Sequence, residues 1–371
     1  MIFEVSRTSS RSLARIGVLQ SDHGEVATPV FMPLATSGAV KTLSGWEVEE
    51  LGAQIVLGNT YHLHLRPGEK LIACQGGLHR WMSWNGAILT DSGGFQAFSL
   101  GESRAKKAKT DEDGVTFYSH LDGRQLRFTS ESVLDIQLSL GSDIVMVLDD
   151  CPPYPASRKR LDMALSRTAH WAEQSISYWR RKRRKGKAIF GIVQGGVIAQ
   201  LRRRSLQQIQ QLPFDGLAIG GVSVGEGKTK MEESVEAIAS ELDPNRPHYL
   251  MGVGEPVDLI RMVARGIDMF DCVLPTRLAR HGSFWDWDFV RHNLSQARFK
   301  ADKRPLDERC RCRYCQRYSR SYLAHLLSSG EVLGIRALSY HNLFVYLELM
   351  KKIRLCIAEG SFERTFHRHL S

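Results

Sequence analysis

The sequence predicts an α/β fold of the (β/α)8 TIM-barrel class with an appended C-terminal subdomain. Short apolar runs recur eight times between residues 29 and 275, and helix-like segments separate most of them. The runs are continuously apolar rather than alternating, as expected of parallel strands that are buried on both faces. Strands that alternate with helices in this way favour a parallel barrel. The pattern stops near residue 295, so we expect the barrel in 1–295 and the subdomain in 296–371.

The predicted strands end abruptly in Gly, Asn, Asp, Ser or Pro, the residue types at which a strand gives way to a turn. An open, doubly wound sheet is the alternative arrangement, but no Gly-x-Gly-x-x-Gly motif follows the first run. A closed barrel is therefore favoured. In chain order the eight runs span 29–38, 54–60, 87–94, 143–150, 188–196, 216–223, 248–254 and 269–275.

Start and stop signals place helices between the runs. The segment 130–141 begins at Ser130 and ends at Gly141, a residue type that favours a helix C-terminus. The other predicted helices span 156–181, 201–212, 230–242 and 256–266, and a final helix lies near 341–358.

Two hairpins decorate the predicted barrel. One spans 16–31 and turns at Asp22–Gly24, and the other spans 115–129 and turns at Asp122–Gly123. Turns with Asp and Gly between apolar segments are typical hairpin signals. The lysine-rich segment 103–114, which precedes the second hairpin, is predicted to be an exposed loop.

Composition indicates a soluble, intracellular protein, which we expect in the cytoplasm. The 371 residues are 43% hydrophobic and 24% charged, which is ordinary for a globular chain. No apolar run approaches the length of about 18 residues that a membrane span needs, and the start lacks an apolar signal-peptide core. The seven cysteines are odd in number and three of them cluster, which argues against a disulfide framework.

The formal net charge is +10 and the pI is about 9.3. An excess of basic residues suits a polyanionic partner such as nucleic acid, although many basic proteins bind no nucleic acid. The densest basic cluster spans 179–187 and ends with Gly186 and Lys187. It is either a helix C-terminus, where cations and glycine are favoured, or a contact surface for RNA. Both interpretations stay open.

Polar and small residues stand where five of the predicted strands end. In TIM barrels the active site lies at this C-terminal end of the strands. A single aspartate there is commonly an ion-pair partner, but several converging carboxylates need a ligand or a proton to lie together. We therefore expect an active site at this rim. The residues concerned are Asp91, Asp149, Asp150, Gln194, Gly220, Gly221 and Asp271.

Three cysteines of the tail have the spacing of metal ligands. Cys310, Cys312 and Cys315 form a Cys-x-Cys-x-x-Cys set, and either His325 or His341 can complete it. Three thiolates and one imidazole make a closed tetrahedral zinc site, which leaves no open position for catalysis. We therefore expect one structural Zn2+ per chain. Packing accounts for the other cysteines, Cys74, Cys151, Cys272 and Cys356.

The motifs resemble those of the bacterial tRNA-guanine transglycosylases, also called queuine tRNA-ribosyltransferases. This family replaces guanine at the wobble position of certain tRNAs with a 7-deazaguanine. The likeness covers nearly the whole chain, and its blocks occur in the family's order. The blocks are TDSGGFQAFSL (90–100), LDDCPPYPA (148–156), GIVQGG (191–196), LAIGG and VGEG (within 217–227), HYLMGVGEP (248–256) and MFDCVLPTRLARHG (269–282).

The resemblance implies a role for each matching residue. Asp271 is then the nucleophile, Asp91 the general acid/base, and Asp149 the carboxylate that reads the amidine edge of guanine. The family spacing favours His341 over His325 as the fourth zinc ligand. A homodimer is also implied. The remaining implied contacts are Gln194 and the Gly221 backbone to the base's carbonyl oxygen, Phe95 and Met251 to its two faces, and Arg277 and Arg280 to the anticodon.

Elementary chemistry agrees with these roles. Base exchange that keeps the sugar configuration is most simply done by two displacements through a covalent sugar ester. A second group must then protonate the departing base. Two rival functions stay open: a retaining sugar hydrolase that uses Asp91 and Asp271, and a non-catalytic RNA-binding member of the family. The first needs an aromatic-lined groove, whereas this rim is glycine-rich, and the second is expected to lack part of the carboxylate set.

The incoming base stays open between queuine and the smaller pre-queuosine base, 7-aminomethyl-7-deazaguanine. In the bacterial pattern of the family the glycine pair is followed by Leu-Ala-Val-Gly-Glu, and here Val222 and Ser223 replace Leu and Ala. A smaller side chain and a new hydroxyl suit the bulky diol of queuine. Val224, in contrast, keeps the bacterial residue.

Overall fold

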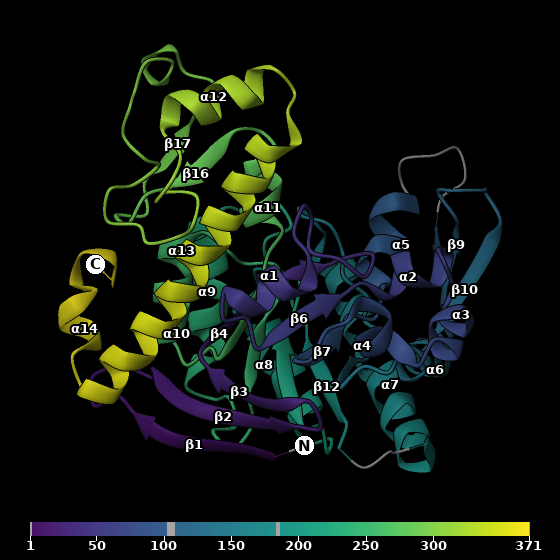
Figure 1. Cartoon of the computed structure of the whole chain (residues 1–371). Helices are drawn as coiled ribbons and strands as arrows, with labels where there is room; N and C mark the ends of the chain where they lie inside the picture. Colours follow the sequence, from purple (N-terminus) through teal and green to yellow (C-terminus); the bar gives the residue numbers. More distant parts are fainter. Residues whose placement is uncertain (1, 102–107, 183–185, 371) are drawn as a thin grey trace.

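Eight parallel strand positions close into a barrel, as the apolar runs predict. The computed structural model describes residues 2–101, 108–182 and 186–370, without the side chains of 98–101 (Figure 1). The first strand is broken at Pro33, so that one part pairs with the last strand and the other with the second strand. In sheet order the strands are β4 (Val30–Met32), β15 (Met269–Asp271), β14 (His248–Leu250), β13 (Gly216–Ile219), β12 (Ala188–Val193), β11 (Ile144–Met146), β7 (Ala87–Thr90), β6 (Ile55–Gly58) and β5 (Leu34–Ala35).

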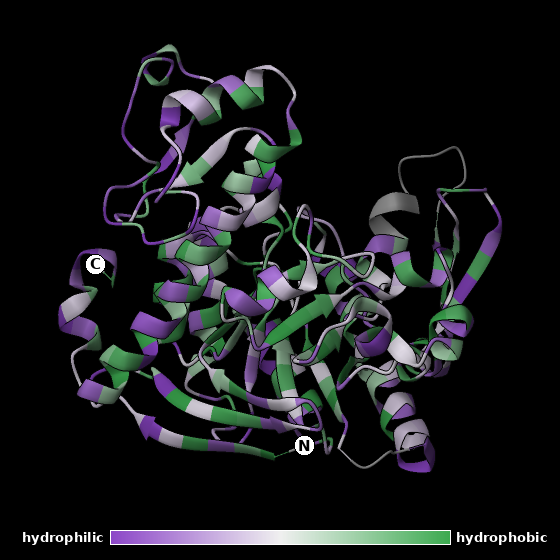
Figure 2. Ribbon diagram, in the orientation of Figure 1, coloured by the Kyte–Doolittle hydropathy of each residue, from purple (hydrophilic) through white to green (hydrophobic). Residues whose placement is uncertain are grey.

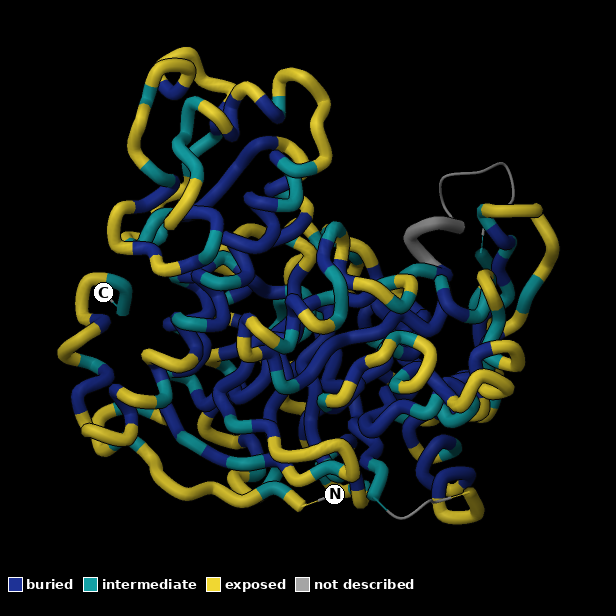
Figure 3. The backbone as a smooth tube through the Cα atoms, in the orientation of Figure 1, coloured by how far each residue is buried: buried dark blue, intermediate teal, exposed yellow. Residues whose placement is uncertain are grey.

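The barrel strands are buried along almost their whole length, which explains their continuous apolar sequence. Figure 2 shows hydrophobic residues gathered on these strands, and Figure 3 shows that the same part of the chain is buried. Helices cover the barrel between successive strands. They are α1 (Gly45–Glu50), α2 (Thr60–Leu65), α3 (Glu69–Cys74), α4 (Gly77–Met82), α5 (Gly94–Gly101), α6 (Ser130–Leu140), α7 (Arg158–Lys182), α8 (Ala199–Gln210), α9 (Lys228–Ala239), α10 (Pro256–Ala264) and α11 (Leu274–Ala279). Helices α6 to α10 match the five predicted segments, whereas α1 to α5 and α11 were not predicted.

Both predicted hairpins are present, and each gains a third strand. β2 (Arg15–Ser21) and β3 (Gly24–Thr28) form the first, and β1 (Ile2–Thr8) pairs with β2. The second hairpin consists of β9 (Gly114–Tyr118) and β10 (Gln125–Thr129), with β8 (Lys109–Thr110) at its edge. Of the predicted exposed loop 103–114, residues 103–107 lie outside the described residues, as do residues 183–185 of the basic cluster.

The tail forms a second lobe around one long helix. Its elements are β16 (Ser283–Trp285), β17 (Arg291–Asn293), a 3-10 turn (Ala297–Phe299), α12 (Arg320–Ser328), α13 (Val332–Glu359), α14 (Phe362–Thr365) and α15 (His367–Leu370). Helix α13 packs against α12 and β16 of this lobe and, farther along, against β4 and β2 (Figure 1).

The prediction of a final helix near 341–358 was wrong at its start, because α13 begins at Val332. Gly334 lies in its first turn, where glycine ordinarily weakens a helix. Here a side chain at Gly334 would press against Leu326 and Leu327 of the preceding segment. The glycine therefore permits the close packing of α12 on α13. Two further short helices, α14 and α15, follow the predicted end.

No helix among residues 2–101, 108–182 and 186–370 combines the length and the apolar character that crossing a membrane requires.

Candidate active site

Residues from the C-terminal ends of the barrel strands line one pocket of about 220 Å³. Asp91 follows β7, Asp149 lies beyond β11, and Asp271 ends β15. Three carboxylates therefore meet where a TIM barrel carries its active site. The pocket also contains most of the other predicted site residues, namely Phe95, Gly221, Val222, Ser223 and Met251.

Asp271 is buried, and only one of its oxygens is engaged. Its Oδ1 accepts hydrogen bonds from the Tyr249 hydroxyl at 2.6 Å and from the Gly252 amide at 2.8 Å. Oδ2 has no hydrogen-bond partner in the described part of the chain. Burial raises the pKa of Asp271, and the two hydrogen bonds oppose this shift. Burial also raises the pKa of Tyr249, so its hydroxyl stays protonated and donates. An oxygen left free at the pocket suits a positioned nucleophile.

Asp91 is held by the turn that follows β6. Its Oδ1 accepts from the Thr60 amide at 2.8 Å, and its Oδ2 accepts from Asn59 Nδ2 at 2.5 Å. Burial raises the pKa of Asp91 to about 7, and the charges of Asp271 and Asp149 act in the same direction. A carboxyl group with such a pKa exchanges a proton readily at neutral pH, as a general acid/base must.

Asp149 lies beside an amide rather than a cation. Its Oδ2 accepts from Gln194 Nε2 at 2.6 Å, and burial raises its pKa to about 7. Gln194 contacts Asp149 but does not itself line the pocket. Its neighbour Asp150 differs, because it forms ion pairs with Arg160 at 2.5 Å and Arg167 at 3.3 Å. Asp149 is thus available to a ligand, and Asp150 is not.

The predicted faces of the base site differ in exposure. Phe95, on α5, is 48% exposed, and Met251 is half-buried. Val222 is buried, whereas Ser223 is exposed and has a left-handed backbone with a φ of 60°. The carboxylate of Glu226 accepts the Ser223 and Val224 amides and holds this loop.

Arg277 and Arg280 do not line the pocket. Both are exposed, on α11 and at its C-terminus, and neither side chain has an ion-pair or hydrogen-bond partner in the described part of the chain. Arg280 lines a separate hollow together with His281, Lys300 and His325. Unpaired cations near the catalytic rim fit a polyanionic ligand.

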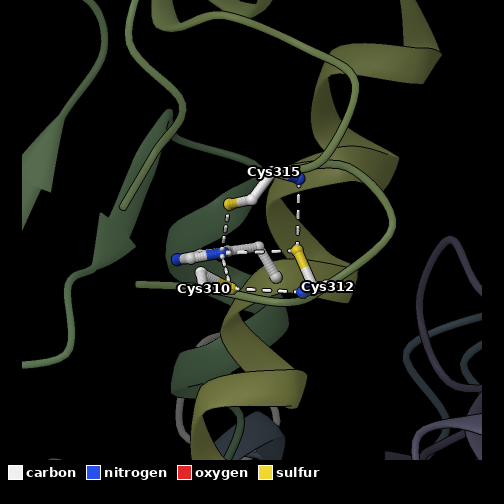
Figure 4. A group of neighbouring side chains, drawn as sticks. Cys310, Cys312 and Cys315 are labelled. Atoms are coloured by element: carbon white, nitrogen blue, oxygen red, sulfur yellow. Dashed lines mark hydrogen bonds between the residues drawn. The ribbon is translucent and has the colours of Figure 1, made fainter. Parts of the chain in front are cut away.

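The four predicted metal ligands meet in the tail (Figure 4). The Sγ atoms of Cys310, Cys312 and Cys315 lie 3.5, 3.7 and 3.3 Å from His341 Nδ1. Zinc at about 2.3 Å from sulfur and about 2.0 Å from nitrogen would separate such atoms by about 3.5 Å in a tetrahedron. His341 Nε2 lies 2.8 Å from the Trp285 carbonyl, which leaves Nδ1 free to bind a metal. The donor set therefore fits Zn2+, and His325 takes no part in it.

The family model described as queuine tRNA-ribosyltransferase matches residues 9–371. The chain belongs to the queuine tRNA-ribosyltransferase family.

Curated relatives carry the same name. This queuine tRNA-ribosyltransferase family member is 50% identical over 364 residues to the Desulforudis audaxviator protein, and the match covers 98% of this chain and 95% of the relative. It is 48% identical to the Halalkalibacterium halodurans protein, with 96% and 92% coverage. It is 47% identical to the Synechococcus elongatus protein, with 98% and 93% coverage.

The sequence did not identify several residues that hold the site of this family member. Tyr249, which donates to Asp271, lies in β14 two residues before Met251, which directly follows the strand, and residues two apart in extended backbone share a face. That spacing could have identified it. Asn59 and Thr60 end the second apolar run in the same way that Asp91 follows the third. The sequence shows that Asn59 and Thr60 lie at a strand end, but it does not show that they bind Asp91.

We expect the Asp149→Asn variant to gain stability relative to the wild type as the pH rises. The pKa of the Asp149 carboxyl is about 7 in the folded protein, against an ordinary value of 3.8, so between these values it is protonated only when the chain is folded. The free energy of unfolding of the wild type therefore falls through this window. The loss at pH 8 is about 4 kcal/mol relative to acidic pH, and about 2–3 kcal/mol of it falls between pH 5 and pH 8. Asparagine has no such titration. Thermal unfolding of both proteins at pH 5 and pH 8 tests this.

The control is Asp113→Asn, which changes an exposed carboxylate. Its stability relative to wild type should vary little with pH. An Asp149→Asn difference that stays constant from pH 5 to pH 8 would show that Asp149 is ionised in the folded protein throughout.

Proposed function

We propose that this chain is a tRNA-guanine transglycosylase, which replaces guanine at the anticodon wobble position with a 7-deazaguanine. One observation carries the proposal. Asp271 has one oxygen fixed by Tyr249 and Gly252 and the other free in a pocket, which it shares with Asp91 and its raised pKa. The match to the family model described as queuine tRNA-ribosyltransferase supports the same function.

The reaction proceeds by two displacements. Oδ2 of Asp271 attacks C1′ of the target nucleoside, and the bond from C1′ to the purine nitrogen breaks. Asp91 donates a proton to the departing guanine and becomes ionised. The incoming base then attacks the sugar ester, gives its proton to Asp91, and releases the Asp271 carboxylate. Two inversions retain the sugar configuration.

The base is recognised by its polar edges and its faces. Asp149 accepts the two N–H groups of the amidine edge, because a carboxylate accepts two parallel hydrogen bonds. The Gly221 backbone binds the carbonyl oxygen, and Gln194 joins it when its side-chain amide turns from Asp149 toward the base. Phe95 and Met251 lie against the two ring faces, and this apolar contact tolerates a changed substituent.

The tail holds a structural zinc ion. Cys310, Cys312, Cys315 and His341 are its ligands, and the bound ion supplies a fixed cross-link between the 310–315 loop and α13. Residues 296–371 are the zinc-binding subdomain beside the catalytic region 1–295, and β16 and β17, which precede this boundary, belong by their packing to the same lobe. The resemblance to the family further supports a cytoplasmic homodimer.

The function is tested by incubating the protein with labelled guanine and bulk tRNA. Label that enters the RNA supports the transglycosylase. Release of free guanine without incorporation would favour a sugar hydrolase, and tight RNA binding without either reaction would favour a non-catalytic family member. Mass spectrometry of the product nucleoside identifies the inserted base.

Arg277 and Arg280 should contribute to salt-dependent tRNA binding. Each phosphate contact releases counterions, so replacing both arginines with glutamine should weaken binding at low salt and make the salt slope shallower by about two. Binding of tRNA measured between low and high salt checks this. Arg203→Gln, at an exposed arginine paired with Glu241, is the control and should leave the slope unchanged.

Competition between queuine and the pre-queuosine base should reveal the role of the Val222–Ser223 loop. We expect Val222→Leu combined with Ser223→Ala to shift preference toward the smaller base, because Val222 and Ser223 line the pocket. Insertion of both bases into tRNA is measured in one mixture. A strong wild-type preference for the smaller base, with no shift in the variant, would end the queuine assignment.

A further inference from the structure

Arg202 is a buried cation that the charge of Glu226 influences but that forms no ion pair with a carboxylate among the described residues. It lies on α8 and is 0% exposed. Buried arginines ordinarily pair with acidic groups. Arg202 forms no ion pair in the described part of the chain, and its hydrogen bonds all go to backbone carbonyls. Burial lowers the pKa of Arg202 to about 10, so the group remains charged at neutral pH.

The four carbonyls belong to two neighbouring loops of the active-site rim. At the end of β12, Nη1 donates to Val193 at 3.2 Å, and in the loop after it Nε donates to Gly196 at 2.8 Å. After β13, Nη1 donates to Gly220 at 2.6 Å and Nη2 to Gly221 at 2.9 Å. One planar guanidinium therefore fixes the orientation of both loops.

The second loop presents its amides to the pocket as a consequence. In a trans peptide the C=O and N–H groups point in opposite directions. Because Arg202 binds the Gly220 and Gly221 carbonyls, the amides of Gly221 and Val222 point away from it, and these residues line the pocket. The Gly221 amide interacts with the Cys151 thiol, whereas the Val222 amide has no acceptor within the described residues.

The first loop is fixed by the same helix. Gln194 lies between the Val193 and Gly196 carbonyls that Arg202 binds. Its backbone N–H donates to Ser205 Oγ of α8 at 2.9 Å. A side chain at Gly221 would collide with the Gln194 amide oxygen, and Gly221 has a φ of 63°. The two loops are thus fitted to each other as well as to Arg202.

We propose that Arg202 is a positioning residue that holds the loop amides and Gln194 in the geometry that binds the carbonyl edge of the base. This inference rests on the proposed function. Lysine cannot replace arginine here, because an ammonium group has three donors around one point and cannot reach four carbonyls in a plane.

The test compares Arg202→Lys and Arg202→Met with the control Arg203→Gln. We expect Arg202→Lys to raise KM for the base by about tenfold to a hundredfold, since one or two hydrogen bonds are misplaced. KM for tRNA should rise less than KM for the free base, because phosphate contacts outside the pocket contribute much of the binding of tRNA and the arginine touches only the two base-binding loops. Arg203→Gln should resemble the wild type. Circular dichroism reports the folding of each variant.

A second readout separates positioning from a general structural role. Inhibition by 7-deazaguanine is compared with inhibition by 2-amino-7-deazapurine, which lacks the carbonyl oxygen. The penalty of Arg202→Lys should be large for the first base and small for the second. Equal penalties for both bases, or an unchanged KM for the base, would overturn the proposal. Failure of both variants to fold would assign Arg202 to barrel stability and overturn it as well.

These outcomes remain distinct from failure of the proposed function. A wild-type protein that inserts no base into tRNA rejects the function itself. A wild-type protein that inserts base, with variants that do so equally well, rejects only the role of Arg202.

Discussion

Asp271→Asn should abolish base exchange and the covalent RNA adduct while the fold stays intact. An amide is a far weaker nucleophile than a carboxylate and does not form the sugar ester. The amide oxygen of the new side chain can still accept the hydrogen bonds that Tyr249 and Gly252 donate to Oδ1, so the local structure should persist. We expect exchange to fall by about 10³-fold or more. Adducts are measured on denaturing gels, and exchange is measured with labelled guanine.

The matched control is Asp113→Asn, which removes an exposed carboxylate and should leave both readouts unchanged. An Asp271→Asn protein that still traps RNA would reject the nucleophile assignment. If Asp91→Asn removes the adduct and Asp271→Asn does not, the roles of the two carboxylates are exchanged. Wild-type kinetics in either aspartate variant would point to a different site altogether.

Cys312→Ala should lose the metal and destabilise the tail. A structural zinc site contributes on the order of 10 kcal/mol to folding, and three remaining ligands bind far more weakly than four. Metal content per chain and thermal unfolding are the measurements. Cys74→Ala is the control, because Cys74 is exposed and lies outside the ligand cluster. Full zinc content in the Cys312→Ala protein would reject the ligand set.

The loss should extend to the catalytic rim, because the ligand His341 lies on α13. The next residue of this helix, Asn342, donates to the Pro275 carbonyl at 2.9 Å, in the segment after β15. Tyr346 donates to the Gly254 carbonyl, in the loop after β14. These segments follow Asp271 and Met251. A chelated or Cys312→Ala protein should therefore lose exchange activity, although the four predicted ligands lie outside the pocket.

The barrel could be predicted because its strands are buried on both faces. The part of the fifth run that forms β12, residues 188–193, carries no polar side chain, since every residue of this strand is buried. The edge strand β1 gave no such signal. Its residues are mostly exposed and follow no apolar alternation, and pairing with β2 alone makes them a strand. A strand of this kind depends on its partner rather than on its own sequence.

The site was predictable where the chemistry belongs to single residues, and less so where it depends on partners. Asp91, Asp149 and Asp271 were visible as polar strand ends. Arg202 was hidden among three consecutive arginines, which resemble a solvated helix surface. Only the phase of α8, with Leu201, Ser205 and Ile209 also buried, places it inward. Its four carbonyl partners come from loops whose shape the sequence does not state.

The environment of Asp149 couples base binding to the uptake and release of protons. Burial raises the pKa of this carboxyl to about 7, so near neutral pH a substantial fraction of the molecules hold its proton. A base that donates two N–H groups to Asp149 stabilises the ionised form and lowers that pKa. Binding therefore expels up to one proton per base at neutral pH. Protons and the base therefore compete for the oxygens of Asp149. Lowering the pH weakens the binding of the base in the way that a competitive inhibitor would.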